Sequence, residues 1–135
     1  MPSQGFTLLE LMITVAIVAI LATIAFASYQ DQIVKSRRAA GASCLQERAQ
    51  FMERYYTTHL SYNDPDTPPV ITACDAEVSP HYTVSLVAGT TARAFILQAV
   101  PQGMQATRDT KCATLTINQQ GTRTESGTGT EADCW

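Results

Sequence analysis

The sequence lacks the residue patterns on which most enzymes and cofactor-binding domains depend. It contains no C-x-x-C pair, no glycine-rich phosphate-binding loop and no catalytic constellation. His59 and His81 have no Cys, Asp or Glu at metal-ligand spacing, and Asp64 and Asp66 lie among prolines that break an EF-hand loop. We therefore expect no enzymatic activity, no cofactor and no metal site.

Positive charge is also scarce. Nine Lys and Arg against twelve Asp and Glu give a formal net charge of −3. This balance excludes a generally basic nucleic-acid-binding domain but leaves room for a local basic patch. The 135 residues correspond to one domain, which is too short for a large enzyme with a separate cofactor domain.

Apolar residues make up 45% of the chain and are concentrated in residues 6–27, FTLLELMITVAIVAILATIAFA. A helix of this length is roughly 33 Å long, enough to cross a bilayer core. A buried core helix is disfavoured because the rest of the chain has too little apolar surface to surround it. A cleaved secretory signal is disfavoured because the leader has no basic residue and the apolar run is long. We predict a membrane-resident helix.

Glu10 is the single charged residue of this apolar run. A carboxylate at that depth costs a few kcal/mol or more in lipid. Either a cation from another chain compensates it, or the side chain lies near the headgroups. Position alone does not separate these alternatives.

Residues 5–10, GFTLLE, resemble the processing motif of type IV pilins and the related secretion pseudopilins. The resemblance implies that a prepilin peptidase cuts between Gly5 and Phe6 and that Phe6 is then N-methylated. It also implies that Glu10 acts in filament assembly by neutralising the terminal amine of a neighbouring subunit in a medium of low dielectric constant. Two departures stand out: the leader carries no Lys or Arg, and Ala27 replaces the helix-kinking proline of similar family members.

The resemblance divides the chain into a prepilin leader (1–5), a transmembrane or filament-core helix (6–28) and a head domain (29–135). Lys35, Arg37 and Arg38 alone would place the head in the cytoplasm, whereas the cysteines favour an oxidising compartment. We follow the cysteines and the motif, because Asp31 offsets the basic cluster. We expect a single-pass inner-membrane protein with a periplasmic head, which becomes extracellular in the assembled pilus.

Periodicity predicts the fold of the head. Helical spacing continues over residues 29–60, where Leu45, Ala49, Met52 and Tyr56 form an apolar stripe. The proline-rich residues 61–81 form an irregular connection. Alternation predicts strands near 82–86, 94–100 and 113–118, a short fourth strand at 122–124, and a mobile loop over 125–133. The predicted class is α+β: a long helix on a three- to four-stranded antiparallel sheet spanning 82–124, as the resemblance to type IV pilins also implies.

Four cysteines permit three disulfide pairings. We favour Cys44–Cys74, which ties the proline-rich connection to the helix, and Cys112–Cys134, which closes residues 112–134 into a loop. Each bridge would contribute roughly 3–4 kcal/mol in the loop-entropy model. The alternative is a set of free, buried thiols.

Residues 53–56 (ERYY), 111–116 (KCATLT) and 133–135 (DCW) narrow the resemblance to PilE-like minor pilins, a subgroup that includes the DNA-binding pilin ComP. The resemblance implies a structural, minor subunit of a type IV pilus that serves twitching motility, adhesion or DNA uptake. Its implied partners are other pilin subunits, the prepilin peptidase, the inner-membrane assembly platform and, before assembly, the inner membrane itself.

Two alternatives remain open. The first is a DNA uptake receptor, in which Arg93, Arg108, Lys111 and Arg123 would converge on one face and contact phosphates. Trp135 or Tyr82 could then stack on the bases of a single strand. The alternative for Trp135 is that it packs beside the C-terminal disulfide. The second is a type II secretion pseudopilin, which the two proposed disulfides disfavour.

Overall fold

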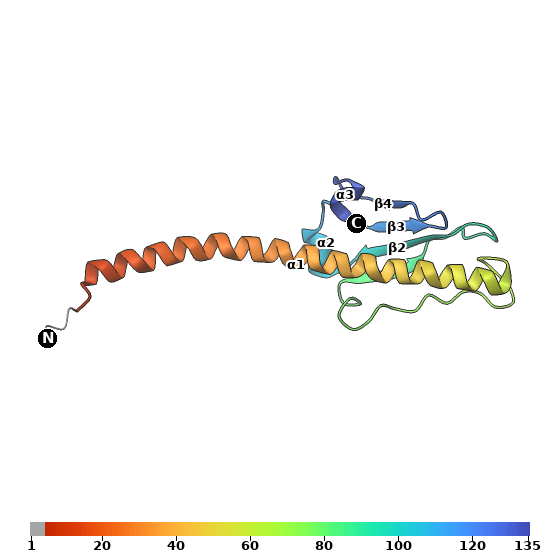
Figure 1. The fold of residues 1–135 in the computed structure, drawn as a ribbon, viewed down its shortest axis with the longest axis horizontal. Helices are drawn as coiled ribbons and strands as arrows, with labels where there is room; N and C mark the ends of the chain where they lie inside the picture. Colours follow the sequence, from red (N-terminus) through yellow and green to blue (C-terminus); the bar gives the residue numbers. More distant parts are fainter. Residues whose placement is uncertain (1–4) are drawn as a thin grey trace. The chain divides into compact units, whose positions relative to one another are not determined.

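One long helix and a small antiparallel sheet make up the fold (Figure 1). The structure is a computed structural model, and it describes residues 5–135. By internal contacts the chain divides into two units, which meet between Ile33 and Val34. The elements, in chain order, are α1 (Leu8–His59), β1 (Tyr82–Leu86), β2 (Ile96–Pro101), α2 (Gly103–Arg108), β3 (Leu115–Asn118), β4 (Arg123–Glu125) and α3 (Glu131–Cys134).

The first unit contains the apolar part of α1, which is long and apolar enough to cross a membrane. The hydroxyl of Thr7 accepts a hydrogen bond from the Glu10 amide at 3.2 Å and caps the helix start. Thr14 and Thr23 donate their hydroxyls to the carbonyls three residues earlier, at 2.8 and 2.7 Å. These bonds satisfy polar groups within the helix itself, as an apolar surrounding requires. The helix continues through Ala27.

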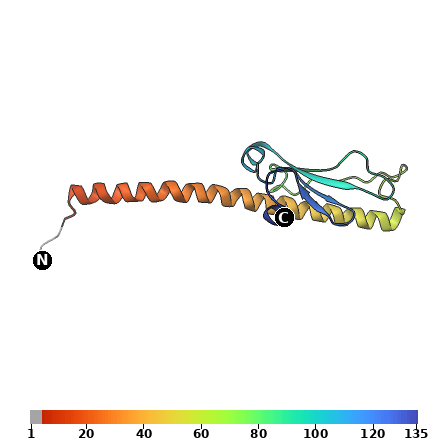
Figure 2. The same cartoon turned by 90° about the horizontal axis from the view of Figure 1, so that it is seen from above.

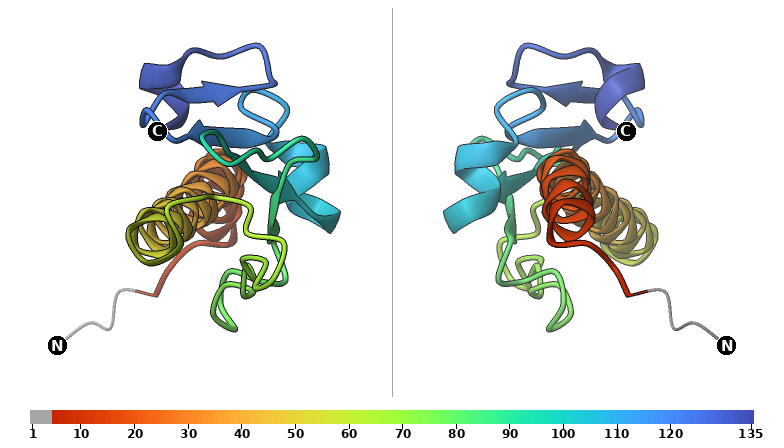
Figure 3. Two further views of the ribbon diagram at one scale, coloured as in Figure 1. Left: turned by 90° about the vertical axis from the view of Figure 1, so that its right-hand side faces the viewer. Right: turned by 90° about the vertical axis from the view of Figure 1, so that its left-hand side faces the viewer.

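In the second unit, the sheet lies along the C-terminal half of α1 (Figures 2 and 3). The strands form an antiparallel meander in the order β1-β2-β3-β4. Alternate side chains of the strands face α1 and are buried, whereas Thr83 is exposed and Thr116 is half-buried on the other face. The core is built from Leu45 and Met52 of α1 and from Val84, Phe95, Leu97, Ala99, Leu115 and Ile117. The predicted α+β class and the apolar stripe of the helix are confirmed.

The connection between α1 and β1 is irregular, as predicted, and is fastened to α1. A disulfide joins Cys44 to Cys74. Arg48 donates to the carbonyls of Thr72 and Ala73 at 3.1 and 3.0 Å. The Tyr62 hydroxyl donates to the Glu53 carboxylate, and burial together with this bond raises the pKa of Tyr62 to about 12. The segment therefore packs on the helix without regular secondary structure of its own.

Several predicted strand bounds were wrong by one or two residues. β2 begins at Ile96 rather than Ala94, because Thr91 and Ala94 are hydrogen-bonded in a turn. β3 begins at Leu115 rather than Ala113, because Ala113 has a φ of 51°, which is incompatible with a strand. β4 extends to Glu125, one residue beyond the predicted sheet.

The sequence analysis missed two short helices and misjudged the C-terminal segment. α2 lies within the region assigned to the sheet. The stretch predicted to be a mobile loop is hydrogen-bonded to the chain around the C-terminal disulfide and then forms α3. The bonds run from Ser126 N to Thr114 O, from Gly127 N to Cys112 O and from Gly129 N to Lys111 O. Gly127 permits this close approach, since a Cβ there would collide with the Lys111 backbone.

Candidate functional sites: the amino-terminal motif and the C-terminal disulfide loop

The amino-terminal motif is accessible. Gly5 and Phe6 precede the first helical residue, and the Phe6 side chain is 85% exposed. A Cβ built on Gly5 would meet no atom within 4 Å. Glu10 lies exposed in the first turn of α1, where the helix dipole favours a carboxylate. The other leader residues, Met1–Gln4, lie outside the described part of the chain.

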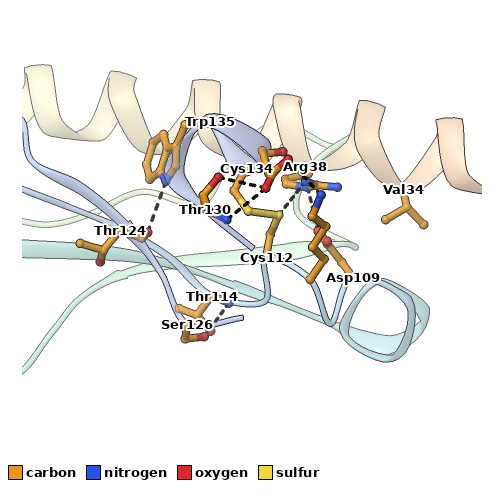
Figure 4. The surroundings of a disulfide bond; sticks show 12 residues. Val34, Arg38, Asp109, Cys112, Thr114, Thr124, Ser126, Thr130, Cys134 and Trp135 are labelled. Carbon is orange, nitrogen blue, oxygen red and sulfur yellow. Dashed lines mark hydrogen bonds and ion pairs between the residues drawn. A yellow bond between two sulfur atoms is a disulfide. The ribbon is translucent and has the colours of Figure 1, made fainter. Parts of the chain in front are cut away.

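A second disulfide, Cys112–Cys134, links the start of the C-terminal segment to α3 (Figure 4). The guanidinium of Arg38, a residue of α1, reaches this bridge. Its Nη1 donates to Cys112 Sγ at 2.7 Å and to the Asp133 carbonyl at 3.0 Å. Its Nε donates to Asp109 Oδ2 at 3.1 Å. One side chain of the long helix thus holds both arms of the disulfide loop.

Asp109 is the acceptor at the centre of a buried network. Its Oδ2 receives hydrogen bonds from Arg38, from the Tyr82 hydroxyl at 2.9 Å and from Gln105 Nε2 at 3.2 Å. Gln105 Nε2 also lies 3.0 Å from the Val34 carbonyl of α1. Burial raises the pKa of Tyr82, and its hydroxyl donates to the carboxylate. Three elements, α1, α2 and β1, are therefore fixed to one carboxylate. The ring is buried, so the prediction that Tyr82 could stack on bases was wrong.

This network was missed at the sequence level, although one signal was present. Arg38 precedes Leu45 by seven residues, so it falls in phase with the apolar stripe of α1. A charged residue in that phase must be buried with a partner. The partner, Asp109, is 71 residues away in sequence and follows a short helix that was not predicted.

The chain end is held by a helix cap and an aromatic contact. Thr130 and Asp133 form a capping box around α3, and Lys111 Nζ lies 3.0 Å from Asp133 Oδ1. The hydrogen bond from Lys111 holds the pKa of Asp133 below its usual range, and the bonds from Thr130 act in the same direction. Trp135 donates its indole N–H to the Thr124 carbonyl at 3.3 Å, and the Arg123 guanidinium lies 5.3 Å from its ring centroid.

The four cations predicted to converge on one face occupy different places. Arg93 lies in the connection before β2, whereas Arg108 ends α2, beyond the opposite end of that strand (Figure 1). Lys111 is paired with an aspartate, and Arg123 stacks on an indole. The strand β2 separates Arg93 from Arg108, so the structure does not gather all four into one patch.

Within residues 5–135 no group of three His, Cys, Asp or Glu side chains could hold a metal ion. His59 does have an acidic neighbour that its sequence spacing did not suggest, since its Nδ1 lies 2.9 Å from Asp64 Oδ2. The Asp66 amide and His59 hold the pKa of Asp64 below its usual range. This pair links His59, the last residue of α1, to the irregular connection that follows the helix.

Comparison with known proteins identifies the family. Residues 1–26 match the prokaryotic N-terminal methylation motif. Residues 27–116 match the family described as "Type IV minor pilin ComP, DNA uptake sequence receptor". The chain belongs to this family of type IV minor pilins. The resemblance found in the GFTLLE motif and in the head is thereby confirmed.

Relatives and solved structures agree with this assignment. The chain is 29% identical over 79 residues to the type IV major pilin protein PilE1 of Neisseria gonorrhoeae, covering 58% of this chain and 48% of that protein. It is 55% identical over 40 residues to the type IV major fimbrial protein FimA of Dichelobacter nodosus, covering 30% of this chain and 25% of that protein. The minor pilin therefore spans about half or less of the length of these curated relatives.

Two solved structures share the fold. A type IV pilin from Shewanella oneidensis superposes with a TM-score of 0.54 at 26% identity, covering 76% of this minor pilin and 97% of that chain. The non-core minor pilin PilV of Neisseria meningitidis gives a TM-score of 0.50 at 26% identity, covering 76% and 94%. The long helix, the four-stranded sheet and the C-terminal disulfide are thus those of the type IV pilin fold.

Proposed function

We propose that this minor pilin is a structural subunit of a type IV pilus, which enters the filament after processing at its amino-terminal motif. The observation that carries the proposal is the methylation motif on an exposed apolar helix, joined to a pilin head. A prepilin peptidase cuts between Gly5 and Phe6, and Phe6 is then methylated. No catalytic activity is proposed, in keeping with a family of structural subunits.

Assembly, in this proposal, exchanges one apolar environment for another. The apolar part of α1 leaves the inner membrane, where an assembly platform holds the subunit, and enters a filament core made by other pilins. Little hydrophobic free energy changes in that transfer, so packing and polar pairing must set the register. Glu10 supplies the polar pairing through the terminal amine of Phe6 on a neighbouring subunit.

The first test is the Glu10→Ala variant. Because Glu10 is exposed and lies outside the head, the variant head should unfold at the same denaturant concentration as the wild type. Incorporation into sheared filaments should be lost. Gly5→Ala is the matched control for processing, and should leave an uncleaved chain in the membrane by mass spectrometry. Wild-type incorporation of Glu10→Ala would overturn the assembly role.

A second candidate function is that of a DNA receptor within the pilus. The match to a family described as a DNA uptake sequence receptor favours it. Of the four predicted cations, Arg123 offers the most defined site, because its guanidinium lies over the Trp135 ring and the residue also lines a groove between α1 and the β3–β4 turn. DNA binding should weaken steeply with salt. Arg123→Gln should reduce it, and Arg54→Gln should not. Equal affinity for all sequences and for both variants would refute a specific receptor role.

The relatives named above are pilus proteins, which favours a pilus over a type II secretion pseudopilin.

A further inference from the structure

The C-terminal disulfide borders a hollow on the surface of the head, which we call the Cys134 hollow. It has a volume of about 190 Å³ and lies within the second unit of the chain. Its lining residues come from α1 and from the chain end: Lys35, Arg38, Ala39, Asp133, Cys134 and Trp135. Lys35 and Ala39 are exposed, so solvent reaches the hollow. One cysteine of the bridge thus lies beside an opening to solvent.

The two cysteines of this bridge differ in their access to the hollow. Cys134 lines it and keeps 4% of its surface exposed, whereas Cys112 does not line it and is completely buried. Thiol–disulfide exchange begins when a thiolate attacks one sulfur atom of a bridge, and its rate depends on access to that sulfur. The hollow therefore presents Cys134 to an incoming thiolate and leaves Cys112 covered.

The buried sulfur is the one that contacts a cation (Figure 4). Arg38 Nη1 donates a hydrogen bond to Cys112 Sγ at 2.7 Å. Across residues 5–135, no side chain donates a hydrogen bond to the sulfur of Cys134, Cys44 or Cys74. A neighbouring guanidinium stabilises a thiolate and makes that sulfur a better leaving group. Opening of the bridge should therefore release Cys112 as a thiolate.

Further titratable side chains lie around the bridge, and one of them opposes Arg38. They come from α1, β1, the end of α2 and the chain end: Lys35, Tyr82, Asp109, Lys111 and Asp133. Lys111 and Asp133 neutralise each other, with Nζ 3.0 Å from Oδ1. Asp109 opposes Arg38, because its carboxylate accepts from Arg38 Nε at 3.1 Å. We expect the direct contact of Arg38 with the sulfur to prevail, since electrostatic energy falls with distance.

We propose that the Cys134 hollow is a site of thiol–disulfide exchange, in which Cys134 forms the mixed disulfide with an external partner and Cys112 is the internal thiolate held by Arg38. In the opening direction, an external thiolate forms a bond to Cys134 Sγ. The Cys112–Cys134 bond breaks, and its electron pair leaves on Cys112. This chemistry goes beyond the pilus function proposed above and does not depend on it.

Closure of the bridge follows the reverse path and needs an oxidant, which we assign to the class of disulfides. The Cys134 thiolate attacks the partner disulfide, forms the mixed disulfide and expels one partner thiolate. The Cys112 thiolate then attacks Cys134 Sγ and expels the second partner thiolate. The two cysteines together lose two electrons and their thiol protons, and the partner disulfide is reduced to two thiols.

Exchange with reduced glutathione tests which sulfur is attacked. The oxidised full chain in detergent micelles is mixed with glutathione, quenched with N-ethylmaleimide at short times and mapped by mass spectrometry. Glutathione should be found on Cys134 and maleimide on Cys112, in at least about tenfold excess over the reverse pattern. The reverse pattern, or an equal mixture of the two, would overturn the proposal.

Two adjacent alanines of α1 allow a matched test of the entry route. Ala39 lines the Cys134 hollow, and Ala40 lines a different hollow beside Cys44. Both alanines are exposed, so a larger side chain at either position should leave the core unchanged. Ala39→Phe should slow glutathione exchange at the C-terminal bridge at least several-fold, and Ala40→Phe should leave that rate unchanged. Equal rates for the two variants would show that the thiolate does not enter through the hollow.

The role of Arg38 is tested in the Cys134→Ser chain, where Cys112 is the single free thiol because Cys44 and Cys74 are bonded to each other. Its ionisation is followed by the ultraviolet absorbance of the thiolate. The cation predicts ionisation below about pH 8.5, the ordinary value for cysteine, whereas burial alone predicts a higher pH. Asp109→Asn in this background removes the opposing charge and should lower the pH of ionisation further, and Arg38→Met should raise it.

These two variants move the ionisation of Cys112 in opposite directions, which a general loosening of the head would not do. Near-ultraviolet circular dichroism checks that each variant is folded, and where Arg38→Met does not fold, Asp109→Asn decides alone. Ionisation of Cys112 above about pH 8.5, or no response to Asp109→Asn, would refute the stabilisation of the thiolate by Arg38.

Discussion

Replacing Arg38 with methionine should be among the most damaging single changes to the head. The guanidinium has three acceptors: the Asp109 carboxylate, the Cys112 sulfur and the Asp133 carbonyl. Methionine fills a similar volume but donates no hydrogen bond. The variant therefore isolates the electrostatic and hydrogen-bonding role of Arg38 from its packing.

The expected loss of unfolding free energy follows from the burial of both charged side chains. Arg38 is 7% exposed and Asp109 is 1% exposed. Removing the cation leaves a buried carboxylate with only the neutral donors Tyr82 and Gln105, and breaking a buried pair in this way costs about 3–5 kcal/mol. A domain is stabilised by only about 5–15 kcal/mol in total. We expect Arg38→Met to remove a large fraction of the unfolding free energy of the head.

The assay is urea unfolding of the oxidised full chain in detergent micelles, followed by near-ultraviolet circular dichroism. Arg54→Met, at an exposed position of the same helix, is the control and should change the unfolding free energy by less than about 0.5 kcal/mol. The double variant Arg38→Met/Asp109→Asn should recover most of the loss, because no buried charge then lacks a partner. A cost below about 1 kcal/mol for the single variant, or a double variant less stable than the single, would refute this account.

Three further predictions concern the same head. Gly41→Ala should destabilise it by about 1–3 kcal/mol although alanine favours helix, since the new Cβ would lie 2.8 Å from the buried Tyr82 ring; urea unfolding measures this, and a stabilised variant would contradict it. Replacing both Cys112 and Cys134 with alanine should cost about 3 kcal/mol in the same assay, given their separation of 22 residues, and no loss would show that the bridge is dispensable. Asp133 has a lowered pKa in the folded state, so its stabilising contribution is present above about pH 4 and is lost as the pH falls through the folded value. Tryptophan fluorescence should report loosening of the chain end on acidification, and Asp133→Asn should remove that step; an identical acid profile would be inconsistent with it.

The parts of the fold that sequence could predict are those with local periodicity. The stripe through Leu45 and Met52, and the alternation in residues 82–86, report directly which side chains face the core. The prolines of residues 61–81 exclude a helix there for an equally local reason. These features rest on backbone preferences and on burial of one face, both of which act between near neighbours in the chain.

The parts that sequence could not predict depend on partners far apart in the chain. α2 has only six residues, too few for a helical pattern to stand out, and it is held by Gln105 and Asp109 against α1. α3 has four residues and is fixed by its cap and by Cys134. The failure of the four predicted cations to converge has the same origin. Arg93 and Arg108 lie at opposite ends of β2, and composition does not show that separation.

The buried network explains how a small core of this kind holds one arrangement. Contacts of Leu45 and Met52 with the sheet are apolar and non-directional, so they would tolerate a rotated or shifted helix. The bonds of Arg38 to Asp109 and to the disulfide loop are directional and are satisfied in one position of α1 only. A buried ion pair adds little net stability compared with apolar residues of the same volume. We therefore attribute its presence to the fixing of one position of α1 against the rest of the head. On this reasoning, the double variant that restores stability would leave α1 less firmly fixed against the C-terminal loop. Stability and uniqueness of the head are then separable properties, the first supplied by the core and the two disulfides and the second by one arginine.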